Sequence, residues 1–147
     1  MPQASKAKSF ICPVDGSKVA ERAAACAVDM AEAAGAKLTF LNINIVPTRA
    51  VRTYFWDSTL FDAADIQSKK QLSAAAKIAK AKKFDNVEGV IATGSNVADA
   101  IVAYAKKNNA SHIVMGTNTT SELARIFLGS VATAVVSHAH CPVTVVK

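Results

Sequence analysis

The C-terminal part of the chain, His112 to Lys147, reads HIVMGTNTTSELARIFLGSVATAVVSHAHCPVTVVK. An apolar run predicts a strand over Ser111–Met115, which stops at Gly116. A polar loop follows, and Gly129-Ser130 then begins a helical run. Small residues after a strand, followed by Gly-Ser at the start of a helix, can hold a phosphate group on backbone N–H groups. The segment therefore predicts an α/β unit with a candidate phosphate-binding loop.

The same alternation of strand and helix extends back to the N-terminus. Apolar runs predict further strands at Ser9–Val14, Lys37–Val46, Val87–Thr93 and Pro142–Val146. Periodic segments with capping residues predict helices at Lys18–Ala34, 65–83, 97–107, Thr120–Leu128 and Ser130–Ala139. Nearly all the strands are apolar, which is typical of a parallel sheet covered by helices on both faces.

Topology rules narrow the fold further. Right-handed crossovers leave few arrangements, and the most economical is a single doubly wound, Rossmann-like five-stranded parallel sheet in the order 3-2-1-4-5. In this order the winding reverses between strands 1 and 4, and ligands bind beyond the carboxyl ends of the strands at that point. Strand 1 brings Asp15 to this crevice and strand 4 brings Gly116, so the two most unusual loops should meet there.

Length and composition restrict the class of protein. The chain has 147 residues, of which 51% are hydrophobic, so we expect one domain over 1–147 with a flexible lead-in over 1–8. No apolar run reaches the length of a membrane span, and no secretory signal is recognisable. The three cysteines are scattered, as in a reducing compartment. These features predict a cytoplasmic protein without a membrane partner.

The net charge of +6 does not by itself indicate nucleic acid. Many lysines fall in the helix predicted over 65–83, interleaved with alanine and without aromatic residues for base stacking, which favours a solvated helix face and no nucleic-acid partner. The inner side of this helix is assigned to Ile66, Leu72, Ala76 and Ala79. The preceding segment, 48–64, is irregular and holds an aromatic cluster that either packs on the domain or binds a partner.

Four segments, in order and with matching spacing, resemble the universal stress protein family over essentially the whole chain. They are Val14-Asp15-Gly16-Ser17, the loop from Gly116 to Ser130, the Gly129-Ser130-Val131 helix start, and Cys141-Pro142-Val143-x-Val145-Val146. The resemblance implies the doubly wound fold above, a homodimer paired through the last strand (Val143, Val145, Val146), and, in members that carry the complete loop motif, ATP binding.

That motif is Gly, two residues, Gly, nine residues, Gly, then Ser or Thr. Gly116, Gly129 and Ser130 match it, but Thr119 stands where the second glycine is expected. A β-branched residue disfavours the left-handed conformation open to glycine and crowds a phosphate, although its hydroxyl can hydrogen-bond one. We therefore expect an altered loop that binds ATP, or ADP or AMP instead, with or without Mg²⁺.

The resemblance also implies roles for individual residues. Asp15 would face the ribose or adenine, although from the residues alone it could simply form the turn. Ser130 could equally be an ordinary helix cap, and Arg125 either neutralises phosphate or is a surface cation. The candidate residues near the base are Pro13, Val14, Asn42 and Ile43; those near the phosphates are Gly116, Thr117, Asn118, Thr119, Arg125, Gly129, Ser130 and Val131.

Catalytic and metal signatures are not found in the sequence. It contains no P-loop, nucleophile elbow or kinase motif, and no paired carboxylates near the loop. His138, His140 and Cys141 cluster, but histidines at a helix end also offset the helix dipole, so we predict no metal site.

The predicted function is an adenine-nucleotide-binding regulatory protein of the stress response, a sensor or switch and not an enzyme, which signals to an unknown regulatory protein partner. The alternative is a dimeric interaction protein of the same fold that binds no nucleotide and works through its dimer surface or the 48–64 segment. Thr119 favours this alternative.

Overall fold

The computed structural model of the protein describes residues 8–46, 58–117 and 128–147. Its strands are β1 (Ser9–Pro13), β2 (Lys37–Ile45), β3 (Val87–Gly94), β4 (His112–Gly116) and β5 (Val143–Val146). Its helices are α1 (Lys18–Ala34), α3 (Ser58–Ala81), α4 (Val97–Lys107) and α5 (Ser130–His138). Within these ranges no helix combines the length and apolarity that crossing a bilayer requires.

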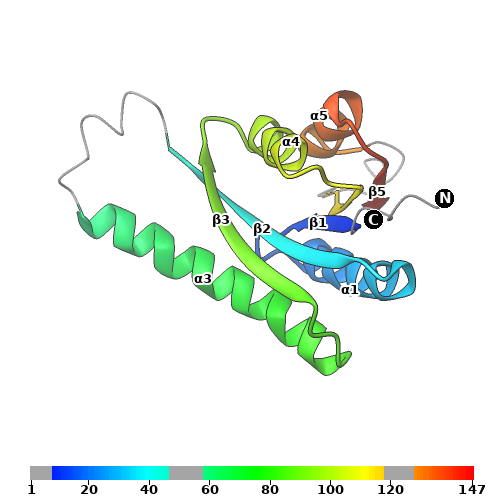
Figure 1. The fold of residues 1–147 in the computed structure, drawn as a ribbon. Helices are drawn as coiled ribbons and strands as arrows, with labels where there is room; N and C mark the ends of the chain where they lie inside the picture. Colours follow the sequence, from blue (N-terminus) through cyan, green and yellow to red (C-terminus); the bar gives the residue numbers. More distant parts are fainter. Residues whose placement is uncertain (1–7, 47–57, 118–127) are drawn as a thin grey trace.

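The five strands form one parallel sheet in the order β3-β2-β1-β4-β5 (Figure 1). Parallel pairing aligns Pro13 with Leu41 across β1 and β2, and Gly116 with Val146 across β4 and β5. α1 and α3 cover one face of the sheet, while α4 and α5 cover the other. The predicted fold class and strand order are confirmed.

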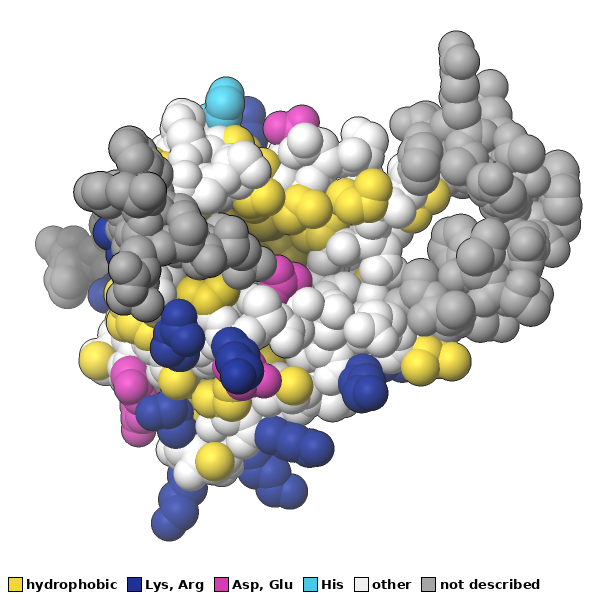
Figure 2. Space-filling view, turned by 180° about the vertical axis from the view of Figure 1, so that it is seen from behind, with side chains coloured by type: hydrophobic (Ala, Val, Ile, Leu, Met, Phe, Trp, Pro, Cys, Tyr) yellow, Lys and Arg dark blue, Asp and Glu magenta, His cyan; other side chains and the backbone are white. Residues whose placement is uncertain are grey.

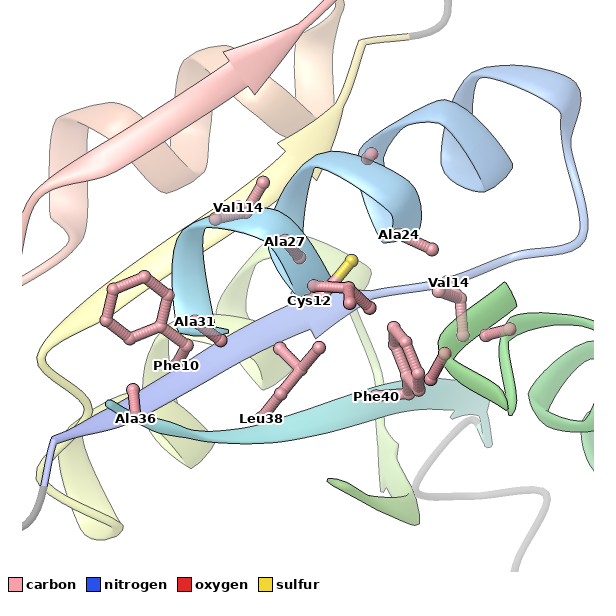
Figure 3. Packing of buried hydrophobic residues seen from close by; sticks show 14 residues of the cluster. Phe10, Cys12, Val14, Ala24, Ala27, Ala31, Ala36, Leu38, Phe40 and Val114 are labelled. Atoms are coloured by element: carbon pink, nitrogen blue, oxygen red, sulfur yellow. The ribbon is translucent and has the colours of Figure 1, made fainter. Parts of the chain in front are cut away.

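Two apolar cores hold these layers together. Under α1 and α3, the large side chains Phe10, Leu38 and Phe40 of β1 and β2 pack against a line of α1 alanines that includes Ala27 and Ala31 (Figure 3). Alanine on the inner face of a helix lets the helix approach the sheet closely, and the bulk comes from the strands. The second core lies on the opposite face, where Ile11, Leu41, Ile101, Ile113, Met115 and Val135 are buried.

Most element boundaries fall within a residue or two of those predicted, but α3 does not. The sequence predicts this helix from residue 65, whereas it begins at Ser58. No glycine or proline interrupts the chain between Pro47 and Gly89, so no helix-breaking residue separates this helix from the segment before it. Three predicted segments lie largely outside the described residues: residues 1–7 of the lead-in predicted over 1–8, the first part of the 48–64 segment, and the helix predicted over Thr120–Leu128 apart from its last residue.

The inward face of α3 also differs from the prediction. Ile66 is 66% exposed and Ala76 is exposed, whereas Ser68 and Ala75 are buried together with the predicted Ala79. Leu72 and Ala79 pack on the core as predicted, but the prediction was wrong for Ile66 and Ala76, because it assumed that every apolar residue of the helix faces the sheet. The end of β2 presents polar side chains to α3 instead, and Ser68 Oγ donates a hydrogen bond to Asn44 Oδ1 at 2.6 Å.

The lysines of α3 and of the turn after it lie on the surface, as expected of a solvated face. On the face seen in Figure 2, lysine and arginine side chains gather along the lower part, and hydrophobic side chains lie in a hollow above them. Lys82 pairs with Asp29 of α1 at 3.0 Å, which is an exposed ion pair of small energetic weight.

Candidate functional site

A cleft of about 410 Å³ opens at the carboxyl ends of β1 and β4, where the winding of the sheet reverses. Residues from the ends of β1, β2 and β4 and from the starts of α1, α4 and α5 line it. Parallel strands place all their carboxyl ends on one edge, and the two neighbouring crossovers leave in opposite directions here, so the edge stays open between them. The cleft is therefore a consequence of the strand order.

The loop after β1 forms one rim. The Asp15 side chain accepts a hydrogen bond from the backbone N–H of Ser17 through Oδ1 at 2.9 Å, and Ser17 Oγ caps α1 by accepting from the N–H of Ala20 at 3.1 Å. Gly16 adopts a φ of +84°, which favours glycine. Asp15 thus forms the turn, which was the alternative to a ligand-binding role in the sequence analysis. It also lines the cleft.

Asp15 is also the single charged side chain among the described residues that line the cleft. Its carboxylate is exposed, and Oδ2 is left to accept a further hydrogen bond, such as one from a sugar hydroxyl.

The opposite rim begins at the end of β4. The N–H of Thr117 donates to the carbonyl of Val146 at 2.9 Å, which extends the pairing with β5 by one residue. Thr117 is 3% exposed, and its Oγ1 accepts a hydrogen bond from the N–H of Gly129 at 2.7 Å. The sequence predicted that the Gly129 N–H would bind a phosphate, but in this structure it already donates to Thr117. This hydrogen bond joins the residues on either side of the intervening loop.

The N-terminus of α5 presents backbone donors beside this rim that bind no described residue. Gly129 is the N-cap and makes no side-chain capping bond, and its carbonyl accepts from the N–H of Thr133 at 2.9 Å. The N–H groups of Ser130, Val131 and Ala132 precede this first intrahelical bond and have no helical partner. Ser130 is the first helical residue and not the cap, so the amides and the positive end of the helix dipole are available to an anion.

Packing alone requires a glycine at position 116, whether or not a ligand binds. A Cβ atom at this position would lie 3.0 Å from both the Cγ2 and the carbonyl oxygen of Val19 in α1. Neither Gly116 nor Gly129 has a positive φ. The first glycine of the loop motif is therefore required by the close approach of β4 to α1.

The remaining wall is apolar. Leu41 and Ile43 of β2, Val97 and Ile101 of α4 and Met115 of β4 line it, and all five belong to the core between the sheet and α4. Sequence reasoning missed Val97, Ile101 and Met115 as lining residues because their helical and strand periodicity indicated core positions. A residue can occupy a core position and still border the cleft, since the core ends where the cleft begins.

A buried amide lies at the end of β2, on the face of the sheet that α3 covers. Asn42 Nδ2 donates to the carbonyl of Val14 at 2.9 Å and to Gln71 Oε1 of α3 at 2.6 Å. The sequence analysis did not identify Gln71. Its position three residues after the buried Ser68 places it on the same inward face of α3, but the burial of Ser68 is itself visible only in the structure.

The structure brings ten of the thirteen predicted site residues to this cleft: Pro13, Val14, Asp15, Asn42, Ile43, Gly116, Thr117, Gly129, Ser130 and Val131. The other three, Asn118, Thr119 and Arg125, lie outside the described residues. Whether these thirteen residues contact a nucleotide stays a prediction.

No three histidine, cysteine or acidic side chains of the described ranges converge as a metal site would require. His138 Nδ1 lies 2.9 Å from the carbonyl of Ala134, one turn earlier in α5, which fixes the ring at the helix end. Mg²⁺ prefers several oxygen ligands and commonly enters with substrate phosphates. Among the described residues of the cleft, Asp15 offers the single carboxylate, which is fewer charged oxygen ligands than a resident ion held by the protein alone would need.

Comparison with known proteins identifies the family. A profile of the universal stress protein family matches residues 6–147. The chain belongs to the universal stress protein family. A universal stress protein of Methanocaldococcus jannaschii is 34% identical over 145 residues, which cover 95% of this chain and 82% of the relative. The structure of UspA, a universal stress protein from Lactobacillus plantarum, superposes with a TM-score of 0.77 at 28% identity, covering 98% of this chain and all of that one.

Two further universal stress proteins of this fold were solved with nucleotides. One, in complex with cAMP, has a TM-score of 0.71 at 24% identity and covers 97% of this chain and 98% of its own. The other, from Archaeoglobus fulgidus in complex with dAMP, has a TM-score of 0.69 at 23% identity and the same coverage. At these identities the likeness concerns the fold alone.

Proposed function

We propose that this universal stress protein binds an adenine nucleotide in the cleft at the ends of β1 and β4 and acts as a regulatory switch of the stress response. The division of the cleft into two chemically different ends carries the proposal. One end offers the free N–H groups of Ser130 and Val131 at a helix N-terminus, and the other offers apolar walls with a single buried amide.

The dimensions and chemistry of the cleft fit such a ligand. A volume of about 410 Å³ lies within the range of small-molecule sites, roughly 300–1,000 Å³. A phosphate belongs at the helix N-terminus, a sugar hydroxyl beside the Asp15 carboxylate, and a flat base between Ile43 and Val97. The cAMP and dAMP complexes support the proposal in that proteins of this fold hold an adenine nucleotide.

The test begins with the purified protein. Heat denaturation followed by chromatography of the supernatant should release an adenine nucleotide, and calorimetric titration of the stripped protein should detect binding of ATP, ADP or AMP. A protein that carries no nucleotide and gives no heat with any of the three at millimolar concentration does not have this function.

A substitution can test the helix N-terminus directly. Ser130→Pro removes one N–H from the first helical position, where the fixed φ of proline is compatible with the helix. The preceding residue, Gly129, has a ψ of 165°, which a following proline tolerates. Loss of one charge-assisted hydrogen bond should weaken nucleotide binding by about 10- to 100-fold.

Lys18→Pro is the matched control. It removes the N–H of the first residue of α1, which also follows an extended N-cap, and Lys18 does not line the cleft. Equal loss of affinity in both variants would mean that helix starts in general, and not the α5 amides, support binding.

We propose a regulatory and not a catalytic role because no described side chain in the cleft is placed to activate a nucleophile. Asp15, the one carboxylate among the described residues there, is exposed and accepts a hydrogen bond from the Ser17 amide, and no second acid or base stands beside it. Incubation with ATP should therefore release phosphate no faster than background hydrolysis. A steady turnover that Ser130→Pro abolishes would contradict this.

The proposal includes a homodimer paired through β5. This strand is an edge of the sheet, all four of its residues are only half-buried, and Val143 and Val145 pack on one core while Val146 packs on the other. An apolar edge with unpaired backbone groups is a natural site for two-fold strand pairing. Light scattering at micromolar concentration should give twice the chain mass, and a monomer would contradict this part.

We further propose that the chain works as a single domain in the cytoplasm, where a regulatory protein partner reads its bound state. The cysteines support a reducing compartment, because Cys12, Cys26 and Cys141 are all free. Cell fractionation with an antibody to the protein tests this assignment, and recovery with the membrane or the exterior would overturn it.

A further inference from the structure

Three helices, α1, α4 and α5, border the cleft with their N-terminal turns, but they are capped differently. At the start of α1, Ser17 Oγ accepts a hydrogen bond from the N–H of Ala20 at 3.1 Å, and at the start of α4 Asn96 Oδ1 accepts one from the N–H of Asp99 at 3.1 Å. Such caps occupy backbone donors of the first turn. α5 begins with Gly129, which makes no side-chain capping bond, so its first turn keeps these donors.

Thr117 supports the start of α5 from outside the helix. Its Oγ1 accepts a hydrogen bond from the N–H of Gly129 at 2.7 Å, although 12 positions separate the two residues. The Gly129 carbonyl in turn accepts from the N–H of Thr133 at 2.9 Å. Both peptide groups that flank Gly129 are therefore held. This matters because glycine has the widest choice of backbone conformations, and these bonds restrict it to one.

The Thr117 side chain is itself firmly placed. Thr117 is 3% exposed, and its N–H donates to the carbonyl of Val146 in β5 at 2.9 Å. Its β-branched side chain has few rotamers, so the hydroxyl fixes the first turn of α5 relative to the end of β4. Because it binds the N–H of the N-cap residue, it leaves the N–H groups of Ser130, Val131 and Ala132, which donate to no described residue.

We propose that Thr117 is a positioning residue of the phosphate site: its hydroxyl holds Gly129, and this fixes the direction of the Ser130 and Val131 amides that bind the phosphate. The inference rests on the proposed function and gives Thr117 an indirect role in place of the direct phosphate contact that the sequence predicted. A segment already held in its bound conformation saves the cost of ordering it when the ligand arrives. The hydroxyl should therefore strengthen binding only of ligands that carry a phosphate.

AMP and adenosine differ only in the phosphate and separate its contribution from the rest of the ligand. The phosphate ratio is defined as the dissociation constant of adenosine divided by that of AMP. Calorimetric titration of the stripped protein measures it, with adenosine in competition against AMP. Thr117→Val keeps the shape of the side chain without the hydroxyl, and it should lower the phosphate ratio about 3- to 10-fold, as loss of one hydrogen bond implies. Thr117→Ser keeps the hydroxyl and should restore most of the ratio.

Thr39→Val is the matched control. Thr39 is also 3% exposed, and its Oγ1 donates to Glu88 Oε1 at 3.1 Å, but it does not line the cleft. Both valine variants should lower the stability measured by urea unfolding, whereas only Thr117→Val should lower the phosphate ratio. An equal fall of the ratio in both variants would assign the effect to general loss of stability and overturn the positioning role.

The direction of the change distinguishes this role from two others. If the Gly129 N–H left Thr117 to bind the phosphate, the hydroxyl would compete with the ligand, and Thr117→Val would raise the phosphate ratio. If Thr117 only supported the fold, AMP and adenosine would weaken equally and the ratio would stay constant. Either result overturns the inference while nucleotide binding stands, whereas failure of every adenine nucleotide to bind removes the proposed function.

A double variant separates an indirect role from direct contact. Ser130→Pro removes one of the amides and also fixes φ of the first helical residue. If Thr117 acts through these amides, Thr117→Val combined with Ser130→Pro should lower the phosphate ratio by less than the product of the two single effects. Effects that multiply would mean that Thr117 contacts the phosphate itself, and the positioning role would be wrong.

Discussion

Replacing Gly116 by alanine should destabilise the fold at the point where β4 approaches α1. The added Cβ would lie 3.0 Å from the Cγ2 atom of Val19, 3.0 Å from its carbonyl oxygen and 3.1 Å from its carbonyl carbon. The side-chain atom could move by a change of rotamer, but the two backbone atoms belong to the first turn of α1. The helix itself must therefore shift.

The size of the effect follows from this contact. Forcing one extra carbon into a packed site costs about 1–3 kcal/mol. Removing a glycine also restricts the unfolded chain, which stabilises the variant by about 0.4–1 kcal/mol. Gly89→Ala isolates this second effect, because a Cβ at Gly89 would meet only the Leu72 side chain at an ordinary 3.5 Å.

Urea unfolding followed by circular dichroism measures both variants. The free energy of unfolding of Gly116→Ala should lie about 1–3 kcal/mol below that of Gly89→Ala, since the entropic gain is common to both. Agreement of the two within about 0.5 kcal/mol would refute the reasoning, and Gly116 would then be explained by a ligand alone.

Three further predictions concern other parts of the fold. Ser17→Ala removes the cap of α1 and should lower the free energy of unfolding by about 1 kcal/mol in urea titrations; an unchanged midpoint would mean that the capping bond to Ala20 contributes nothing. Partial burial lowers the pKa of His112 from its ordinary value of 6.5, so the unfolded state binds more protons between the two values. Stability should fall as the pH drops through 6.5 and level off below the lowered pKa, and His112→Gln should lack this component in urea titrations at pH 7.5 and 5.5. Full burial raises the pKa of the Cys12 thiol, so maleimide should label the native protein at Cys26 and Cys141 before Cys12, and rapid native labelling of Cys12 would contradict its burial.

The sequence by itself determined the order of the elements and the strand order. Periodicity is a local property, as in the apolar run before Gly116 and the capped helix that begins at Lys18, and right-handed crossovers then leave few arrangements. The same rules bring Asp15 and Gly116 to one crevice. These features needed no knowledge of which side chain touches which.

The tertiary structure decided the contacts between distant segments. The inward turn of Ser68 and Gln71 depends on Asn44 and Asn42, which lie 24 and 29 positions earlier in the chain. Local periodicity placed Leu72 and Ala79 correctly but missed Ser68, because a buried polar residue is recognisable only through its partner.

For two glycines of the loop motif, the structure likewise shows a role in packing or hydrogen bonding that the sequence alone did not predict. The Gly129 N–H is bonded to Thr117, 12 positions away, and Gly116 is held by its closeness to Val19. A sequence motif records which residues are present, but only packing shows which backbone groups remain free for a ligand. In this protein those groups begin at Ser130, where α5 starts without a capping side chain.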